Sequence, residues 1–175
     1  MVLASRNVET LNQISDEINS NGGSSIAVKT DVTSLDSCNN MIKESIKAFG
    51  NVDSLILNAG ISMWARFDKI TDTTLFHKIN EINYQGSVNC VYASIDELKK
   101  NNGQIVAITT AQALMGFPNA SAYSASKHAL HGFLETLQIE LGNTISVSNV
   151  YLGWIKGTNL RANALGPDGK KIGEK

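Results

Sequence analysis

Short apolar runs alternate with amphipathic stretches along most of this chain. The runs that we predict as strands read MVLA, SIAVKTDV, VDSLILNAG, GQIVAITT and ISVSNVYLG. Between them, apolar residues recur three and four positions apart, which indicates helices with one face toward a sheet. The pattern predicts these helices over residues 7–23, 34–49, 74–100 and 122–141.

Capping residues support the helix boundaries. Asn7 is a suitable N-cap for the first helix, and Gly22 and Gly23 are typical of its end. The second helix is expected to begin at a cap formed by Thr33 or Ser34 and to end at Gly50. Its expected sheet-facing residues are Leu35, Met41, Ile42, Ile46 and Phe49.

Alternating strands and helices with continuously apolar strands predict an α/β fold. We expect a Rossmann-like, doubly wound parallel sheet covered on both faces. No repeat or linker divides the chain, so residues 1–175 are predicted to form a single domain. Ligands of such folds bind beyond the carboxyl ends of the strands. Small or polar residues stand at those ends: Ser5, Arg6, Asp31, Val32, Asn58, Ala59, Gly60, Thr109, Thr110, Leu152 and Gly153.

Composition adds few constraints. Hydrophobic residues make up 42% of the 175 residues and charged residues 18%, which is typical of a globular domain. The net charge of −1 gives no reason to expect a nucleic-acid partner. No run reaches the roughly 18 apolar residues of a membrane span. Cys38 and Cys90 match no metal or redox spacing and are expected to be free thiols, and no metal site is predicted.

Tyr123 and Lys127 are the strongest catalytic candidates. Residues four apart share one face of a helix, so both side chains should lie together near the start of the fourth helix. An ammonium group and a helix N-terminus both favour phenolate, and a tyrosine so placed could protonate an alkoxide. The hydroxyl of Thr110 could hold that oxygen. Alone, the pair is also compatible with a small-residue helix that carries a tyrosine by chance.

Several motifs together resemble the short-chain dehydrogenases/reductases, which are Rossmann-fold enzymes that use NAD(H) or NADP(H). The matching segments, in order, are LNAG, INYQG, GQIVAITT, YSASK and LGWIKGTNL. The resemblance runs from Met1 to about Asn159 and is strongest to the branch of 11β-hydroxysteroid dehydrogenase-like proteins.

The resemblance implies a role for each matching residue. Tyr123 would be the acid/base, Lys127 would lower its pKa and bind the nicotinamide ribose, and Asn83 would anchor a water that relays protons. Thr110 takes the place of the substrate-orienting serine and keeps its hydroxyl. The segment after the last predicted strand would contact the nicotinamide and its phosphates through Gly153, Ile155 and Thr158. It departs from the family pattern at Leu152, where proline is usual, and at Gly157, where threonine is frequent.

The cofactor preference depends on Ser5 and Arg6. An aspartate after the second family strand would bind the adenosine ribose and repel a 2′-phosphate. Here Arg6 stands there instead, and arginine suits a phosphate, so we expect NADP(H) rather than NAD(H). Arg6 could also be an ordinary solvated residue. Asp31 and Val32 would flank the adenine, while Asn58, Ala59 and Gly60 would serve mainly the backbone around the site.

The family's Gly-rich phosphate turn is missing from the sequence. Met1 falls at the family's second strand, so the resemblance implies a truncated domain without the first strand, the glycine turn and the first helix. Such a domain would leave a central sheet position unfilled. A catalytically silent remnant without competent dinucleotide binding is therefore the alternative to an active oxidoreductase. A cytoplasmic location is expected, although an anchor or signal could have been lost with a native N-terminus.

The substrate is predicted only as a small-molecule carbonyl or alcohol. Residues 154–175, beginning at Trp154, would form part of the substrate loop. Met63, Trp64 and Phe67 could border the pocket or simply form a hydrophobic loop cluster. His128 and His131 are expected to have surface or packing roles. Family members commonly form dimers or tetramers through the two long helices, so a homodimer or homotetramer is possible here.

Overall fold

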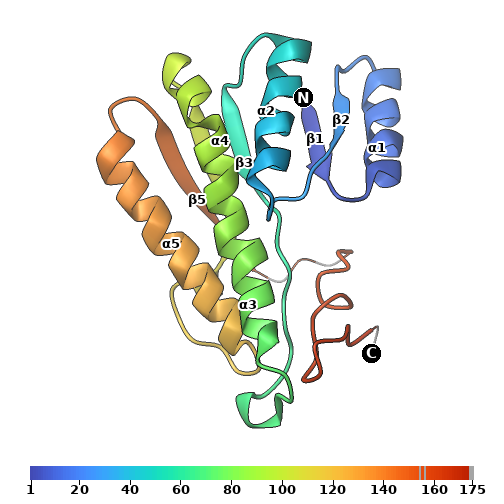
Figure 1. Cartoon of the computed structure of the whole chain (residues 1–175), viewed down its shortest axis with the longest axis vertical. Helices are drawn as coiled ribbons and strands as arrows, with labels where there is room; N and C mark the ends of the chain where they lie inside the picture. Colours follow the sequence, from blue (N-terminus) through green and yellow to red (C-terminus); the bar gives the residue numbers. More distant parts are fainter. Residues whose placement is uncertain (154, 156, 174–175) are drawn as a thin grey trace.

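The computed structural model describes residues 1–153, 155 and 157–173 as a sequence of strands and helices in alternation (Figure 1). The strands are β1 (Val2–Ser5), β2 (Ile26–Lys29), β3 (Ser54–Leu57), β4 (Gln104–Thr110) and β5 (Ser146–Leu152). The longer helices are α1 (Val8–Ser20), α2 (Leu35–Phe49), α3 (Thr74–Asn80), α4 (Gly86–Lys100) and α5 (Ser121–Leu141). Short helical segments are η1 (Phe67–Lys69), η2 (Glu81–Gln85) and η3 (Ala111–Ala113). Each predicted strand and helix is therefore confirmed in type.

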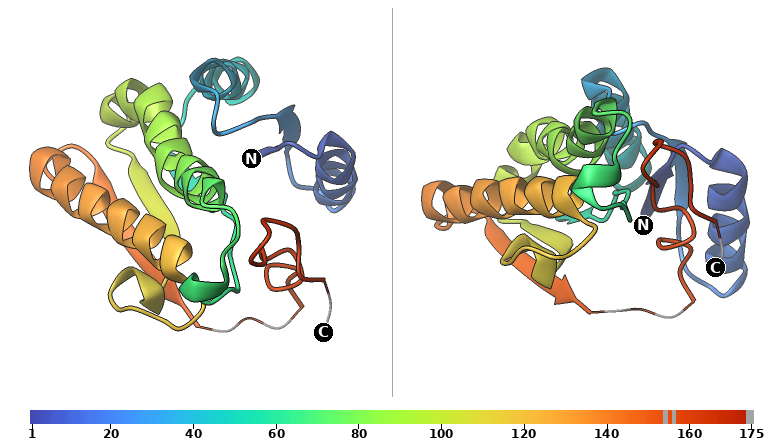
Figure 2. Two further views of the ribbon diagram at one scale, coloured as in Figure 1. Left: turned by 60° about the horizontal axis from the view of Figure 1, so that its bottom comes forward. Right: turned by 90° about the horizontal axis from the view of Figure 1, so that it is seen from below.

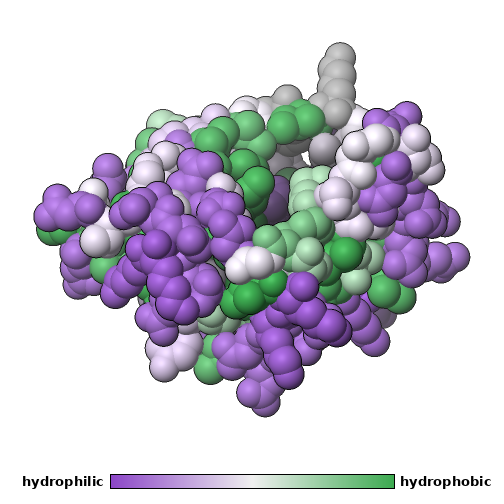
Figure 3. Space-filling view, turned by 90° about the horizontal axis from the view of Figure 1, so that it is seen from above, coloured by the Kyte–Doolittle hydropathy of each residue, from purple (hydrophilic) through white to green (hydrophobic). Residues whose placement is uncertain are grey.

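The described strands form two separate parallel sheets. β1 pairs with β2, and β3, β4 and β5 pair in that order, with no strand hydrogen-bonded between β1 and β3. The views in Figure 2 show these two parts side by side, and Figure 3 shows a hollow between them bordered by apolar surface. The resemblance implied a sheet in which one central strand position is unfilled. The edges of β1 and β3 border this position, so the strands on its two sides form separate sheets.

The predicted α/β fold with parallel strands is confirmed, and the helices that pack on the larger sheet cover one of its faces. α4 and α5 pack beside α2 in one layer on the β3–β4–β5 sheet (Figure 2). Both crossovers, from β3 to β4 and from β4 to β5, advance in the same direction, and right-handed crossovers then leave both helices on the same side. On the other face of this sheet, among the described residues, Ile56 is 62% exposed and Val150 is 39% exposed.

The main core lies between this helix layer and the strands. It contains Leu55, Leu57, Ile105, Ala107 and Val147 from one face of the sheet. A second cluster, which includes Met63, Leu75, Ile79, Tyr123 and Leu165, lies at the start of α5. The segment around Leu165 returns to this cluster, where Trp64 and Leu165 are joined by a backbone hydrogen bond of 2.9 Å.

The helix ends follow the sequence signals closely. The side chain of Asn7 accepts a hydrogen bond from the backbone N–H of Thr10, as an N-cap does. Ser34, rather than Thr33, caps α2 by accepting from the N–H of Ser37. Gly50 ends α2 with a φ of 86°, a left-handed conformation that glycine adopts at no cost. Leu35 and Phe49 correct the prediction for α2, because each is 37% exposed at an end of the helix, beyond the reach of the sheet.

The long helix predicted over residues 74–100 contains an unpredicted irregularity. α3 and α4 are joined by η2, a π-helical turn over Glu81–Gln85. Such a turn adds one residue to the helical repeat and so redirects the side chains that follow, and it is frequent at functional sites. The spacing of apolar residues alone does not predict the π-turn, because helical spacing is present both before and after it.

No helix in the described part of the chain is long and apolar enough to cross a bilayer.

Two glycines provide a test of the packing. A Cβ at Gly103 would lie 2.7 Å from the carbonyl oxygen of Asp53 and 2.9 Å from a Leu98 methyl, whereas Gly132, in α5, has nothing within 4 Å. We expect Gly103→Ala to destabilise the fold by about 1–3 kcal/mol through overpacking against the backbone. Gly132→Ala, the matched control, should stabilise it by about 0.5–1 kcal/mol through helix propensity. Urea unfolding of both variants measures the difference, and equal effects would contradict this packing.

Candidate active site

The sequence candidates fall into two groups at the carboxyl ends of the strands. One group follows β3 and β4 and includes Gly60, Thr110 and the start of α5. The other follows β1 and β2 and includes Arg6 and Asp31. The two groups therefore belong to different hydrogen-bonded sheets.

Tyr123 and Lys127 lie in the first two turns of α5, as the spacing predicted. Both are buried, with 9% and 5% of their surfaces exposed. The Lys127 Nζ lies 5.8 Å from the centre of the Tyr123 ring. Among the described residues this ammonium has no hydrogen-bond acceptor, so it is a buried polar group available to a ligand.

Burial dominates the titration of this pair. It lowers the pKa of Lys127 from 10.5 to about 8, because a buried ammonium loses its hydration. It raises the pKa of Tyr123 above its usual 10.0, because phenolate also loses hydration. The pKa of Tyr123 is therefore raised by burial, and the expected lowering by Lys127 is not seen.

Asn83 is fully buried in the π-turn η2 and joins the two neighbouring elements of the site. Its Oδ1 accepts a hydrogen bond of 2.8 Å from the N–H of Ile61, and its Nδ2 donates to the Ile61 carbonyl at 2.9 Å. The same Nδ2 donates to the Ser126 hydroxyl at 3.0 Å. The side chain is therefore fixed to the turn after β3 and to α5 at once.

Gly60 leaves the space in which these groups meet. A Cβ on Gly60 would lie 3.3 Å from the Asn83 Oδ1 and 3.7 Å from the Lys127 Nζ. Any side chain at this position would therefore crowd both polar groups. Asn58 and Ala59, just before it, are exposed, and no hydrogen bond from the Asn58 side chain to a neighbouring strand is present in the described part.

Ser126 is a site residue that our sequence analysis did not single out. It is 1% exposed, accepts the hydrogen bond from Asn83 and donates one of 2.8 Å to the Tyr123 carbonyl. It therefore links the π-turn to the helix turn that carries the tyrosine. The only sequence signal was a serine three residues after Tyr123, where a hydroxyl can bond back to the backbone of its own helix.

Thr110 ends β4, and its Oγ1 accepts a hydrogen bond of 3.4 Å from the N–H of Gln112. That hydroxyl retains its proton for donation to another oxygen.

Gly153 follows β5, and a Cβ there would meet open space. Ile155 is 52% exposed, and the Thr158 hydroxyl donates to its carbonyl at 3.5 Å. Trp154 lies outside the described residues, as do 156, 174 and 175.

Arg6 and Asp31 lie close enough to interact at the ends of β1 and β2. Two hydrogen bonds from Thr33 hold the pKa of Asp31 below its usual range, and the positive charge of Arg6 lowers it further. Ser5 accepts a hydrogen bond from the N–H of Asn7 at 3.2 Å. The carbonyl of Val32 accepts one of 2.9 Å from the Asn89 side chain, which fixes the loop after β2 to α4.

The apolar residues after β3 divide into two environments. Met63 is buried, with 1% exposed, and its sulfur accepts the N–H of Ala122 at 3.2 Å. Phe67 is 71% exposed. Arg161 stacks over the Trp64 ring at 5.5 Å. Met63 therefore belongs to the interior rather than to a pocket border.

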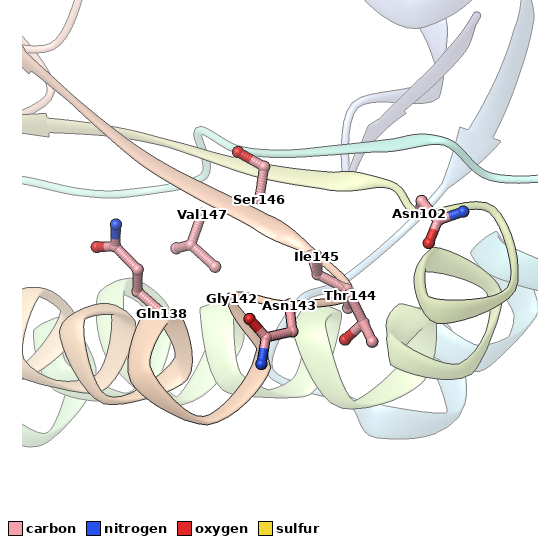
Figure 4. Close-up of a pocket in the computed structure, with 8 residues that line it drawn as sticks. All are labelled: Asn102, Gln138, Gly142, Asn143, Thr144, Ile145, Ser146 and Val147. Atoms are coloured by element: carbon pink, nitrogen blue, oxygen red, sulfur yellow. The ribbon is translucent and has the colours of Figure 1, made fainter.

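Hollows elsewhere on the molecule are separate from this site. One of about 240 Å³, at the opposite end of the larger sheet, lies between the end of α5 and the start of β5 (Figure 4). It is bordered by Gln138, Gly142 and Ser146. Among the described residues no cluster of three or more potential metal ligands is present.

Comparison with known proteins assigns a family. The model of the short chain dehydrogenase family matches residues 1–167. An 11-beta-hydroxysteroid dehydrogenase of Pinus massoniana is 30% identical over 173 residues, which cover 98% of this chain and 49% of that protein. An 11-beta-hydroxysteroid dehydrogenase-like 3 of Arabidopsis thaliana is 40% identical over 131 residues, which cover 75% of this chain and 42% of that protein. The chain thus spans about half the length of the curated relatives it matches.

Solved structures agree with this assignment. A 3-ketoacyl-ACP reductase of Sinorhizobium meliloti superposes with a TM-score of 0.83 at 28% identity, covering 90% of this chain and 63% of that one. A short-chain dehydrogenase/reductase of Burkholderia phymatum, in complex with NAD, gives 0.79 at 25% identity, covering 85% and 54%. The chain belongs to the short-chain dehydrogenase/reductase family, and its relatives are 11β-hydroxysteroid dehydrogenases and similar proteins.

Proposed function

We propose that this chain carries the proton-transfer site of an NADP(H)-dependent oxidoreductase that interconverts a small-molecule carbonyl and an alcohol. The observation that carries the proposal is the buried pair of Tyr123 and Lys127 beside Asn83, in a member of this family. The similar structure from Burkholderia phymatum supports a dinucleotide, because that protein was solved in complex with NAD.

The residues present fit a dinucleotide at both ends of the site. The unpartnered Lys127 ammonium suits the hydroxyls of a ribose, and Arg6 suits a phosphate. The bound dinucleotide would supply or accept the hydride. The sequence contains no Gly-rich turn of the kind that binds a pyrophosphate.

In the proposed reaction, Tyr123 donates its phenolic proton to the oxygen of the substrate carbonyl. Thr110 would donate a hydrogen bond to the same oxygen and fix its position. Lys127, when protonated, would stabilise the phenolate that Tyr123 leaves behind. Its pKa of about 8 means that its charge varies within the physiological pH range, so proton exchange through this pair is possible near neutrality.

Asn83 would act as a positioning residue in this scheme. Its side chain is bonded to the Ile61 backbone and to Ser126, so it holds the turn after β3 against α5. We also propose that Asn83 anchors a water molecule that relays protons between Lys127 and solvent.

The alternative is a silent remnant that does not bind a dinucleotide competently. One observation favours it: β1 and β3 each have an edge without a strand partner, so the adenosine side and the proton-transfer side are not joined by a continuous sheet. Binding measurements distinguish the two possibilities.

A homodimer or homotetramer is a further proposal. It is supported by exposed apolar residues on the two long helices, since Tyr92 on α4 is 70% exposed and Ile139 on α5 is 86% exposed.

Tyr123→Phe tests the acid/base role. The variant keeps the ring and loses the proton, so kcat/KM for NADPH-dependent reduction of a carbonyl panel should fall by about 10²–10⁴-fold. Tyr92→Phe, an exposed position on α4, is the control and should keep wild-type turnover. Full activity of Tyr123→Phe would refute the mechanism. No turnover by the wild-type chain would favour the remnant.

Arg6→Gln tests the cofactor preference by calorimetric titration with NADPH and NADH. Removing a charged partner of the 2′-phosphate should weaken NADPH binding by at least about 10-fold, with NADH unchanged. Arg66→Gln, on an exposed residue paired with Asp68, should change neither. Equal loss of both cofactors would contradict the assignment to Arg6, and absence of binding by the wild-type chain would support the remnant.

The buried Lys127 predicts an unusual dependence of stability on pH. Below about pH 8 the lysine is protonated in the folded and unfolded chains, and the cost of burying its charge is present. Between about 8 and 10.5 only the unfolded chain holds the proton, so stability rises with pH by about 1.4 kcal/mol per unit. Urea unfolding at pH 7.5 and 9.5 should show this rise in the wild type but not in Lys127→Met.

The matched control for this measurement is Lys43→Met, at an exposed position on α2. It should retain the wild-type dependence. An identical pH dependence in wild type and Lys127→Met would show that Lys127 stays protonated throughout.

A further inference from the structure

Two buried thiols face each other between α2 and α4. Cys38 lies in the first turns of α2 and is 0% exposed, and Cys90 lies in α4 and is 6% exposed. Their sulfur atoms are 3.7 Å apart, although 52 positions separate them in the sequence. Figure 1 shows the two helices side by side. The fold thus creates a pair that the cysteine spacing did not predict.

We propose that Cys38 and Cys90 are a reversible redox site, which a hydroperoxide oxidises to a disulfide that links α2 to α4. The sulfur atoms must approach by about 1.7 Å to reach disulfide bonding distance. α2 follows a strand of the smaller sheet, and α4 connects two strands of the larger one. Because no hydrogen bonds join these sheets among the described strands, a small movement of α2 toward α4 breaks none between strands.

The two thiols differ in reactivity. The contact with Cys90 holds the pKa of Cys38 below its usual value, because the Cys90 thiol can donate a hydrogen bond to the Cys38 thiolate. The same contact, and then burial, raise the pKa of Cys90. The carboxylate of Asp31 acts on Cys38 in the opposite sense with a smaller effect. The thiolate is the nucleophile in such chemistry, and the lowered pKa assigns this role to Cys38 in the proposed reaction.

The oxidation balances with a single hydroperoxide. The Cys38 thiolate attacks the terminal peroxide oxygen, the O–O bond breaks, and the alcohol leaves with a proton, which gives a sulfenic acid. The Cys90 thiol then loses its proton as its sulfur attacks the Cys38 sulfur, the S–S bond forms, and the sulfenic hydroxyl takes up a proton and leaves as water. Two thiols are oxidised and the peroxide is reduced, and an external dithiol reverses the reaction.

A groove lies beside the helix turns that carry this pair. It has a volume of about 380 Å³ and lies between α2 and α4. Its lining includes Ile42, one turn after Cys38, and Ala93, three residues after Cys90. The groove is thus about one helical turn along each helix from the residue that carries the thiol, and neither cysteine lines it.

The test uses the whole chain in its native state. After treatment with hydrogen peroxide, the chain is unfolded for alkylation, because both thiols are buried in the native state. We then expect an intact mass lower by two hydrogens, no alkylation of either thiol, and a Cys38–Cys90 cross-linked peptide. Dithiothreitol should restore both thiols. Full alkylation of both thiols, links only between separate chains, or oxidation of single cysteines without a bridge would overturn the proposal.

Two variants and a stability measurement complete the test. Neither Cys38→Ala nor Cys90→Ala can form the bridge, so peroxide should not lower the mass of either variant by two hydrogens. The bridge closes a long loop, so it should raise the melting temperature of the wild type by on the order of 5 °C. Peroxide should give no such rise in Cys38→Ala, which controls for methionine oxidation. The wild-type mass measurement stays decisive if either variant fails to fold.

Discussion

The candidate site depends on the pairing of one buried amide with one backbone segment. Asn83 uses its donor and its acceptor on the same residue, Ile61, and so joins the π-turn to the chain that leaves β3. An unpaired buried amide costs about 1–3 kcal/mol, so this arrangement is strongly specified. It also fixes Ser126, and through Ser126 the helix turn that carries Tyr123. The π-turn matters for the same reason, since it sets the direction of the Asn83 side chain.

Packing around this amide brings the reactive groups together and also determines their electrostatics. Gly60 has no side chain, so the Asn83 amide and the Lys127 ammonium can approach the same backbone. Both Tyr123 and Lys127 are therefore buried, and burial opposes charge on each. In the proposed enzyme, a bound ligand with polar groups near Lys127 would replace the lost hydration. The free energy cost of burying Lys127 without hydration would thus favour a ligand with polar groups at this point.

Much of the fold could be predicted because its signals are local. The caps at Asn7 and Ser34 and the left-handed Gly50 depend on residues within one turn of each other. The π-turn could not be predicted, because apolar spacing continues through it. The contact between Cys38 and Cys90 could not be predicted either, because it depends on how two helices pack when their cysteines are 52 positions apart in the sequence. Leu35 and Phe49 fit the helical period, yet each is 37% exposed at an end of α2. Periodicity predicts which side of a helix a residue lies on, but it does not predict how far the sheet extends beneath that helix.

The candidate site was predictable to a similar degree and for similar reasons. Tyr123 and Lys127 lie on one face because a helix requires it. Ser126 was missed because its partners, Asn83 and the Tyr123 carbonyl, act through tertiary contact. The strand ends correctly locate Arg6 and Asp31, yet strand order alone does not show that β1 and β3 are separated. A dinucleotide that contacted Arg6 and Lys127 would have to span this separation. Part of its binding energy would then be used to hold the two sheets in one relative position. The affinity for the dinucleotide and the free energy of unfolding should therefore be linked more tightly in this chain than in a protein with one continuous sheet.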